Sequence, residues 1–211
     1  MVKLYFLIFA FLMVNFLYAQ YPGYSQLTNY AKLKSEFSAA TQKTLTIKSD
    51  FVQEKNLSML SEKIVSKGKF WFRKDNQVRM EYTQPFQYLM IINKDKVYVK
   101  DGQKENQISS KSNKLFQQIN KIMIDCMQGT TLDNADFRTR IFENKTDYLV
   151  ELVPVVKGLK ELFKNINVLV DKKDYSVNTI LLQEVAGDNT TINFLNKELN
   201  TNLQDALFTI K

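Results

Sequence analysis

The most constraining feature of the sequence is a succession of short, apolar-rich segments, most of them separated from the next by a brief turn. Five lie in the first half, at 45–52, 63–73, 77–82, 88–93 and 96–100. Turn-forming residues stand between them, as in Lys74-Asp75-Asn76 and Asp101-Gly102. Connections this short join antiparallel neighbours, because a parallel pair needs a long crossover. The pattern therefore predicts an antiparallel meander.

The second half repeats this pattern after one change of period. Two segments have the three- and four-residue spacing of apolar positions that is typical of amphipathic helices, namely 25–40 and 112–127. Five more strand segments follow the second helix, at 137–143, 148–153, 166–170, 176–184 and 190–195. The turns 171–174 and 187–189 are typical of hairpins. We expect one large curved sheet with one helix before it and one inserted in its middle.

Several of these strands are apolar on both faces. In Phe70-Trp71-Phe72, for example, the two phenylalanines share one face and the tryptophan lies on the other. A sheet with one face in water should alternate cleanly, so both faces are expected to be covered, or one face lines a cavity. The helices either pack as an ordinary core, which the pattern alone favours, or form a lid over an apolar pocket.

The first nineteen residues have the composition of a cleavable secretory signal peptide. Lys3 supplies a positive charge, an apolar run extends from Leu4 to Val14, and Ala19 is a small residue before the expected cut. A membrane anchor is the alternative, but a spanning helix needs about 20 apolar residues, and Asn15 interrupts this run. No cysteine stands directly after the expected cut, so we expect a released protein without a lipid anchor there.

The remaining residues, 20–211, are expected to form one domain. The formal net charge is +7, but the lysines are scattered along the chain, which predicts a solvated surface and no nucleic-acid binding. Attraction to anionic lipid or to an acidic partner is the alternative. The chain has no histidine and a single cysteine, Cys126. These facts exclude histidine-dependent triads and an internal disulfide, and we expect no enzymatic activity, no metal and no cofactor.

One stretch resembles the outer-membrane lipoprotein carrier family (LolA-like). From Gly68 to Pro85 it combines a glycine, an aromatic-rich strand, a basic turn, an Arg-x-x-Tyr and a proline. Motifs similar to those of the family lie upstream of this stretch at 50–53 and downstream at 96–102 and 187–194, and the resemblance extends over 25–210. It implies an α+β fold: an incomplete antiparallel β-barrel of about ten or eleven strands, with helices lidding the concave face. It also favours the lid over the packed core.

The resemblance also assigns a site. In the family, an arginine six residues after the motif glycine holds the lid closed. Lys74 occupies that position here, followed by Asp75 where a proline is expected, and lysine lacks the planar fork of arginine. A plain turn lysine is the alternative. Alternation places the ligand-binding residues on one face: Phe70, Phe72, Lys74, Val78, Met80, Tyr82, Met90, Ile92, and from the inserted helix Leu115, Phe116, Ile119 and Met123. Simple core packing is the alternative for each.

The function implied by the resemblance is that of a monomeric periplasmic carrier, which shields the acyl chains of lipoproteins. Its partners would be an acylated lipoprotein or lipid cargo, an inner-membrane release complex and an outer-membrane acceptor. A carrier of another lipid or glycolipid on the same fold is an alternative. A non-enzymatic module that binds a partner protein is a further one.

Overall fold

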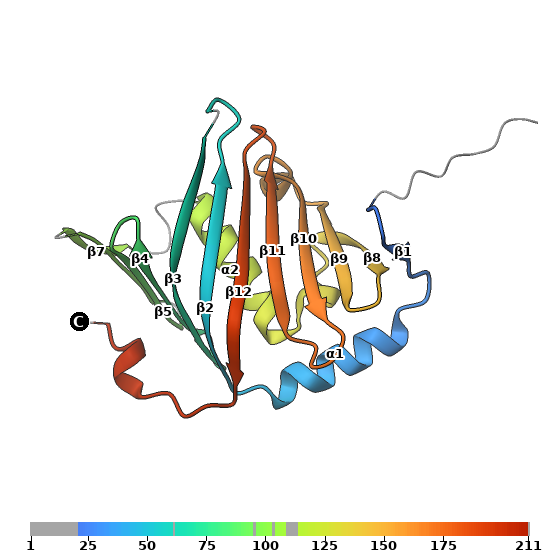
Figure 1. Cartoon of the computed structure of the whole chain (residues 1–211), viewed down its shortest axis with the longest axis horizontal. Helices are drawn as coiled ribbons and strands as arrows, with labels where there is room; N and C mark the ends of the chain where they lie inside the picture. Colours follow the sequence, from blue (N-terminus) through green and yellow to red (C-terminus); the bar gives the residue numbers. More distant parts are fainter. Residues whose placement is uncertain (1–20, 61, 95, 103, 109–113, 211) are drawn as a thin grey trace, which may run out of the picture.

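The protein is described here by a computed structural model that covers residues 21–60, 62–94, 96–102, 104–108 and 114–210. The described strands form one antiparallel sheet in the order β1-β8-β9-β10-β11-β12-β2-β3-β4-β5-β6-β7 (Figure 1). The sheet curves into an incomplete barrel, which confirms the expected α+β fold. The predicted signal peptide, 1–19, lies outside the described residues.

The strands of the first half are β1 (Ser25–Gln26), β2 (Thr46–Asn56), β3 (Lys63–Arg73), β4 (Gln77–Gln84), β5 (Tyr88–Asn93), β6 (Lys96–Asp101) and β7 (Lys104–Ile108). Those of the second half are β8 (Phe137–Glu143), β9 (Asp147–Pro154), β10 (Phe163–Asp171), β11 (Val177–Glu184) and β12 (Asn189–Leu199). All ten expected strands are present. The sequence patterns missed β1 and β7, which form the two edges of the sheet.

The main helices are α1 (Ala31–Lys43) and α2 (Lys114–Gln128), with short turns at α3 (Lys157–Lys160), η1 (Thr131–Asp133) and η2 (Asp205–Phe208). The expectation that the first helix begins at residue 25 is wrong, because the backbone of 25–27 pairs with β8 instead. In Figure 1, α2 lies behind the sheet and α1 runs along its lower end, beneath β9 to β12. Both helices follow an edge strand and lead back to the sheet.

The concave face of the sheet carries the hydrophobic core. Strand register places Phe70 beside Met80, and Met80 beside Met90, so that apolar side chains form continuous rows across β3, β4 and β5. Leu33 and Phe37 of α1 are buried in the same core. From α2, Ile122, Met123, Cys126 and Met127 join it. This burial supplies the main driving force for folding, at about 25 cal/mol per Å² of apolar surface.

The convex face of β3 to β5 is covered by the C-terminal tail. The side chain of Phe208 in η2 is 1% exposed, and the Arg73 guanidinium lies 4.6 Å from the centre of its ring. The Arg79 Nη1 donates to the carbonyl oxygen of Leu207 at 3.2 Å. Trp71 is buried on this outer face, as its alternation with Phe70 requires. The tail therefore explains why these strands are apolar on both sides.

Candidate functional site

The end of α1 is attached to the turn between β3 and β4. Lys74 lies in that turn, and its Nζ donates a 3.1 Å hydrogen bond to the carbonyl oxygen of Gln42, in the last turn of α1. A cation at this position also interacts favourably with the negative end of the helix dipole. Arg73 points to the opposite face, where it pairs with Asp205. The position that resembles the latch of the family thus contacts the helix expected to act as a lid.

The structure brings most of the predicted ligand-binding residues into one continuous core. Seven of them are buried side by side on the concave face or on α2: Phe70, Phe72, Val78, Met80, Met90, Ile92 and Met123. Tyr82 and Ile119 are half-buried and pack against this core. Leu115 and Phe116 belong to α2, but their side chains fall outside the described part of the chain. Contact of these residues with a ligand stays a prediction.

A narrow space, the inner gap, separates α1 from the core near its C-terminal end. It measures about 10 Å³ and is lined by α1, α2 and the β10–β11 hairpin through residues that include Thr41, Cys126 and Tyr175. A space of this size holds at most about one water molecule. The helices and the sheet are therefore in contact here, and an acyl chain enters this part of the core only if α1 moves away.

A wider hollow, the mouth, opens at the opposite end of the strands. It measures about 430 Å³ and is lined by residues of β2 to β6, among them Gln53, Tyr82, Phe86 and Tyr88. The Tyr82 ring contacts Phe51 and Tyr88 edge-on, at centroid distances of 4.8 and 5.4 Å. Its hydroxyl donates to Oε1 of Gln53 at 3.0 Å. Burial raises the pKa of Tyr82 well above its usual range, so the phenol remains neutral.

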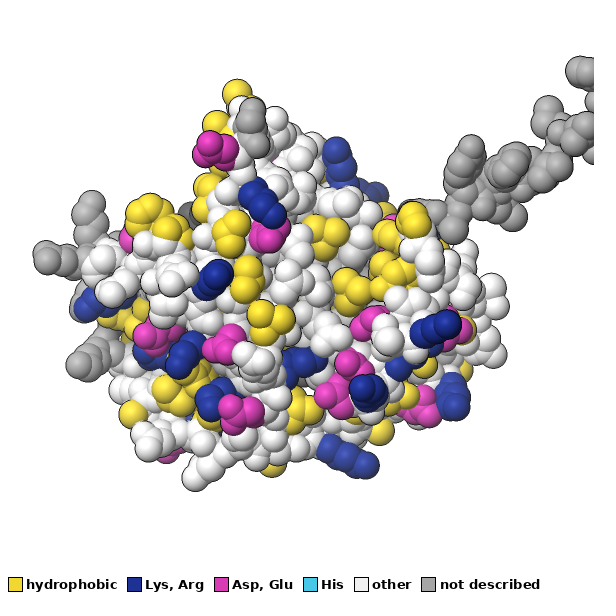
Figure 2. Space-filling model, viewed as in Figure 1, with side chains coloured by type: hydrophobic (Ala, Val, Ile, Leu, Met, Phe, Trp, Pro, Cys, Tyr) yellow, Lys and Arg dark blue, Asp and Glu magenta, His cyan; other side chains and the backbone are white. Residues whose placement is uncertain are grey.

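Exposed apolar side chains lie at the same end of the sheet as the mouth. Strand register places the loops after β2, β4, β9 and β11 at this same end of the sheet. They carry an apolar rim of Met59, Leu60, Phe86, Val155, Val156 and Val185. Met59 is 94% exposed and Phe86 is 75% exposed. Figure 2 shows hydrophobic side chains at the tip of the molecule, where β2 and β3 meet. The sequence patterns missed this rim, because isolated apolar residues in loops carry no periodicity.

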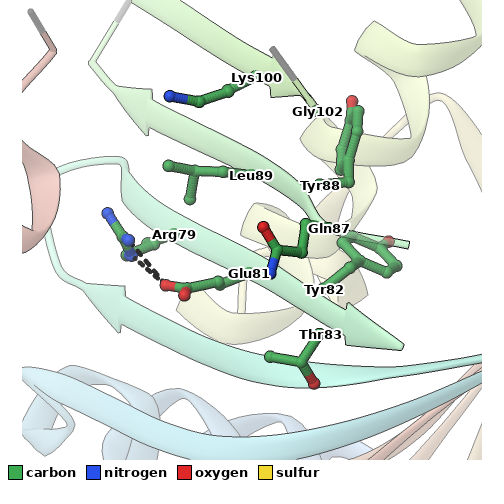
Figure 3. A pocket seen from close by; sticks show the side chains of 9 residues that line it. All are labelled: Arg79, Glu81, Tyr82, Thr83, Gln87, Tyr88, Leu89, Lys100 and Gly102. Atoms are coloured by element: carbon green, nitrogen blue, oxygen red, sulfur yellow. Dashed lines mark hydrogen bonds and ion pairs between the residues drawn. The ribbon is translucent and has the colours of Figure 1, made fainter. Parts of the chain in front are cut away.

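A second hollow, of about 250 Å³, lies between the outer faces of β4, β5 and β6 (Figure 3). Arg79 and Glu81 form an ion pair there, with Nη2 and Oε2 separated by 2.7 Å, and Leu89 and Lys100 lie above them. Arg79 also bonds to the C-terminal tail. Because the charge of Arg79 is already balanced by Glu81, Arg79 offers a ligand in this hollow no unpaired positive charge.

Three groups of side chains and helices bear on the chemistry that the described residues can support. Within the described ranges, no group of three or more cysteine, aspartate and glutamate side chains is placed to hold a metal ion. Burial raises the pKa of the Cys126 thiol to about 12, so the reactive thiolate is not formed near neutral pH. No helix in the described part of the chain has the length and apolar character needed to cross a membrane.

Comparison with known proteins places these features in context. The sequence model of the family described as "Outer membrane lipoprotein carrier protein LolA" matches residues 42–211. No curated protein matches the chain significantly. A LolA superfamily protein from Nitrosomonas europaea has a similar structure, with 7% identity, a TM-score of 0.49, and coverage of 87% of this chain and 99% of that one.

The Pseudomonas aeruginosa MucA/MucB complex contains another similar structure. The identity is 11% and the TM-score is 0.50, with 84% of this chain and 59% of that chain covered. This chain therefore spans less than two thirds of that relative. At such identities the structural likeness shows the fold alone.

Proposed function

Because the chain belongs to the outer membrane lipoprotein carrier family LolA, we propose that it is a periplasmic carrier that moves lipoproteins from the inner to the outer membrane. The observation that carries this proposal is the concave face, where apolar side chains of the sheet are covered by two separate helices. Such a face can shield acyl chains once the helices move. The carrier makes and breaks no covalent bond.

The energetics suit a carrier that must also release its cargo. Each shielded methylene group contributes about 0.8 kcal/mol to binding. Opening the lid removes Leu33 and Phe37 from the core, and this cost offsets part of the gain. The net affinity is then modest, so that transfer proceeds toward a tighter acceptor. Met80, Met90 and Met123 supply flexible side chains that adapt to acyl chains of different shape.

The proposed route requires partners at both membranes. An inner-membrane complex releases the acylated cargo to this protein, and an outer-membrane acceptor receives it. The domain 20–211, released by cleavage near Ala19, acts as a monomer between them. This arrangement agrees with a chain whose described helices include no membrane-spanning segment.

The apolar rim favours a second candidate, a module that binds a partner protein. A relative of the same fold was solved in a complex, that of Pseudomonas aeruginosa MucA and MucB. Met59 and Phe86 extend into solvent at this end of the sheet, where a partner could cover them. A glycolipid or another lipid is a further cargo compatible with the same concave face.

One capture experiment separates these candidates. Mature protein, residues 20–211, is incubated with inner-membrane vesicles that hold a tagged, acylated lipoprotein. The matched control is the same lipoprotein with its acylated cysteine replaced. We expect a soluble complex only with the acylated form. Equal capture of both forms favours protein recognition, and mass spectrometry of extracted lipids identifies a glycolipid. No soluble complex with either form contradicts the proposed carrier.

A further inference from the structure

The hairpin between β10 and β11 contains a tyrosine in a backbone conformation that tyrosine rarely adopts. Tyr175 has φ of +59°, in the left-handed region where glycine or asparagine is favoured. The hairpin does not need a tyrosine for its own geometry. Its backbone closes through the Tyr175 N–H and the Asp171 carbonyl, and Asp174 accepts two hydrogen bonds from Ser176. A strained residue of this kind points to a role for its side chain.

The Tyr175 side chain reaches α1. Its hydroxyl donates a 2.6 Å hydrogen bond to Oε2 of Glu36, a half-buried residue of that helix. The hydrogen bond and the charge of Glu36 raise the pKa of Tyr175 to about 12, so the phenol remains a donor near neutral pH. This bond joins residues 139 positions apart in the sequence. It therefore attaches the helix directly to the sheet.

The ring of Tyr175 also packs against a second aromatic ring. It stacks on Tyr148 of β9, with centroids 6.3 Å apart and planes 15° from parallel. The Lys172 ammonium lies 4.7 Å from the centre of the Tyr148 ring and also binds Glu143. The stack therefore fixes Tyr175 against the sheet. Of these residues, Glu36 alone belongs to α1.

The contact lies beside the only cysteine of the chain. Tyr175, Cys126 and Thr41 line the same inner gap, and the Cys126 side chain is 1% exposed. On the α2 side, Gly129 fits closely against Thr41, and Lys34 forms an ion pair with Asp133. Because α1 covers Cys126, exposure of the thiol reports movement of α1.

We propose that Tyr175 is a positioning residue that clamps α1 over the concave face, and that breaking its bond to Glu36 is part of lid opening. The clamp is separate from the Lys74 contact, which holds the C-terminal end of the same helix. The proposal rests on the proposed function only where it treats opening as the step that admits cargo. The closed position of α1 and its attachment do not depend on which cargo is carried.

Labelling of Cys126 by a thiol reagent tests the clamp without any cargo. The substitution Tyr175→Phe removes only the hydroxyl, and Glu36→Gln removes only the charge. Loss of a hydrogen bond to a carboxylate should raise the labelling rate about tenfold or more in the phenylalanine variant. The double variant should label no faster than Tyr175→Phe, because the same contact is lost. Tyr98→Phe, on the convex face of β6, is the matched control and should label at the wild-type rate.

A second variant separates the clamp from general stability. Tyr175→Gly fits the left-handed backbone but removes the whole stack, so it should label faster than Tyr175→Phe while its urea midpoint stays near the wild-type value. Wild-type labelling of Tyr175→Phe and Tyr175→Gly would overturn the clamp. The clamp would also be overturned if both variants labelled faster and both also had a lowered urea midpoint, because general destabilisation would then explain the labelling. If labelling rises as expected but no acylated cargo is captured, the clamp stands and the carrier function fails.

Discussion

The hydroxyl of Tyr21 donates a 2.7 Å hydrogen bond to Oε1 of Glu151, a carboxylate that is only 1% exposed on the convex face of β9. Arg140 of β8 pairs with the other carboxylate oxygen, and the side-chain amide of Asn167 lies 3.1 Å from the Tyr21 hydroxyl. The Tyr21 ring also meets Phe142 edge-on at 4.9 Å. Tyr21 thus covers the buried carboxylate of Glu151 in the middle of β9.

Loss of the Glu151 carboxylate should be destabilising. Glu151→Ala removes the acceptor of the Tyr21 hydroxyl and the ion-pair partner of Arg140, and we expect a loss of about 1–3 kcal/mol in the free energy of unfolding. Urea titration followed by circular dichroism measures it. Glu161→Ala, on the exposed end of α3, is the control and should change stability by less than about 0.5 kcal/mol. Equal midpoints for the two variants would contradict the buried network.

The Tyr21 bond should have a distinct pH dependence. Burial, followed by the bond to Glu151, raises the pKa of Tyr21 to about 12, above its ordinary value of about 10. A group with a raised pKa contributes stability that is complete below pH 10 and declines as pH rises toward 12. Tyr21→Phe should therefore cost about 1 kcal/mol at pH 8 and progressively less above pH 10. A stability difference that grew with pH would contradict this assignment.

The motif glycine is required by close packing between strands. A Cβ on Gly68 would lie 2.1 Å from the carbonyl oxygen of Glu81 and 2.8 Å from the Phe51 ring. Gly68→Ala should cost at least about 2–3 kcal/mol, or prevent folding, because backbone must move to make room. Gly102→Ala is the control: its Cβ meets nothing within 4 Å, and only the φ of +57° opposes it. Thermal unfolding compares them, and a smaller loss at residue 68 would contradict the prediction.

The C-terminal tail should contribute to the stability of the whole sheet. Phe208→Ala removes a buried ring from contact with Arg73, and we expect a loss of about 3–4 kcal/mol. Thr209→Ala, at the exposed next residue, should be nearly neutral. Urea titration by tryptophan fluorescence suits this test, since Trp71 lies on the same face. A neutral Phe208→Ala would mean that the tail is not docked in solution.

Lys74 should contribute only weakly to the stability of α1, through its single hydrogen bond to the end of that helix. Lys74→Ala removes one hydrogen bond to the end of α1, which we expect to contribute about 1 kcal/mol or less. Lys74→Arg retains the charge and the donors and should preserve stability. Hydrogen exchange of the α1 amides measures the local effect. Slower exchange in Lys74→Ala than in wild type would contradict an attachment of α1 by this residue.

The sequence predicted the sheet well because its strands are long and its turns have clear chemistry. Phe70, Phe72, Val78 and Met80 were expected on one face, and strand alternation does place them together. The two edge strands were missed for different reasons. The pairing of Ser25–Gln26 with β8 joins distant parts of the chain, and Lys104–Ile108 has no apolar alternation.

The contacts around the candidate site were harder to predict because they join distant segments. Nothing near Tyr175 in the sequence indicates Glu36, and nothing near Trp71 indicates the C-terminal tail. One signal was available at Glu151, since a charged residue inside the apolar strand 148–153 implies a buried partner. The identity of that partner required the fold.

The position of β12 beside β2 has a consequence for how the chain reaches this structure. The two strands join the halves of the sheet, and Asn56 and Asn189 in this pair are 133 residues apart. Closing so long a loop costs entropy before any contact compensates for it, which slows folding. A chain that emerges N-terminus first must keep one edge of β2 without its partner until Asn189–Leu199 arrives. The two halves of the sheet can therefore join only after β12 has emerged.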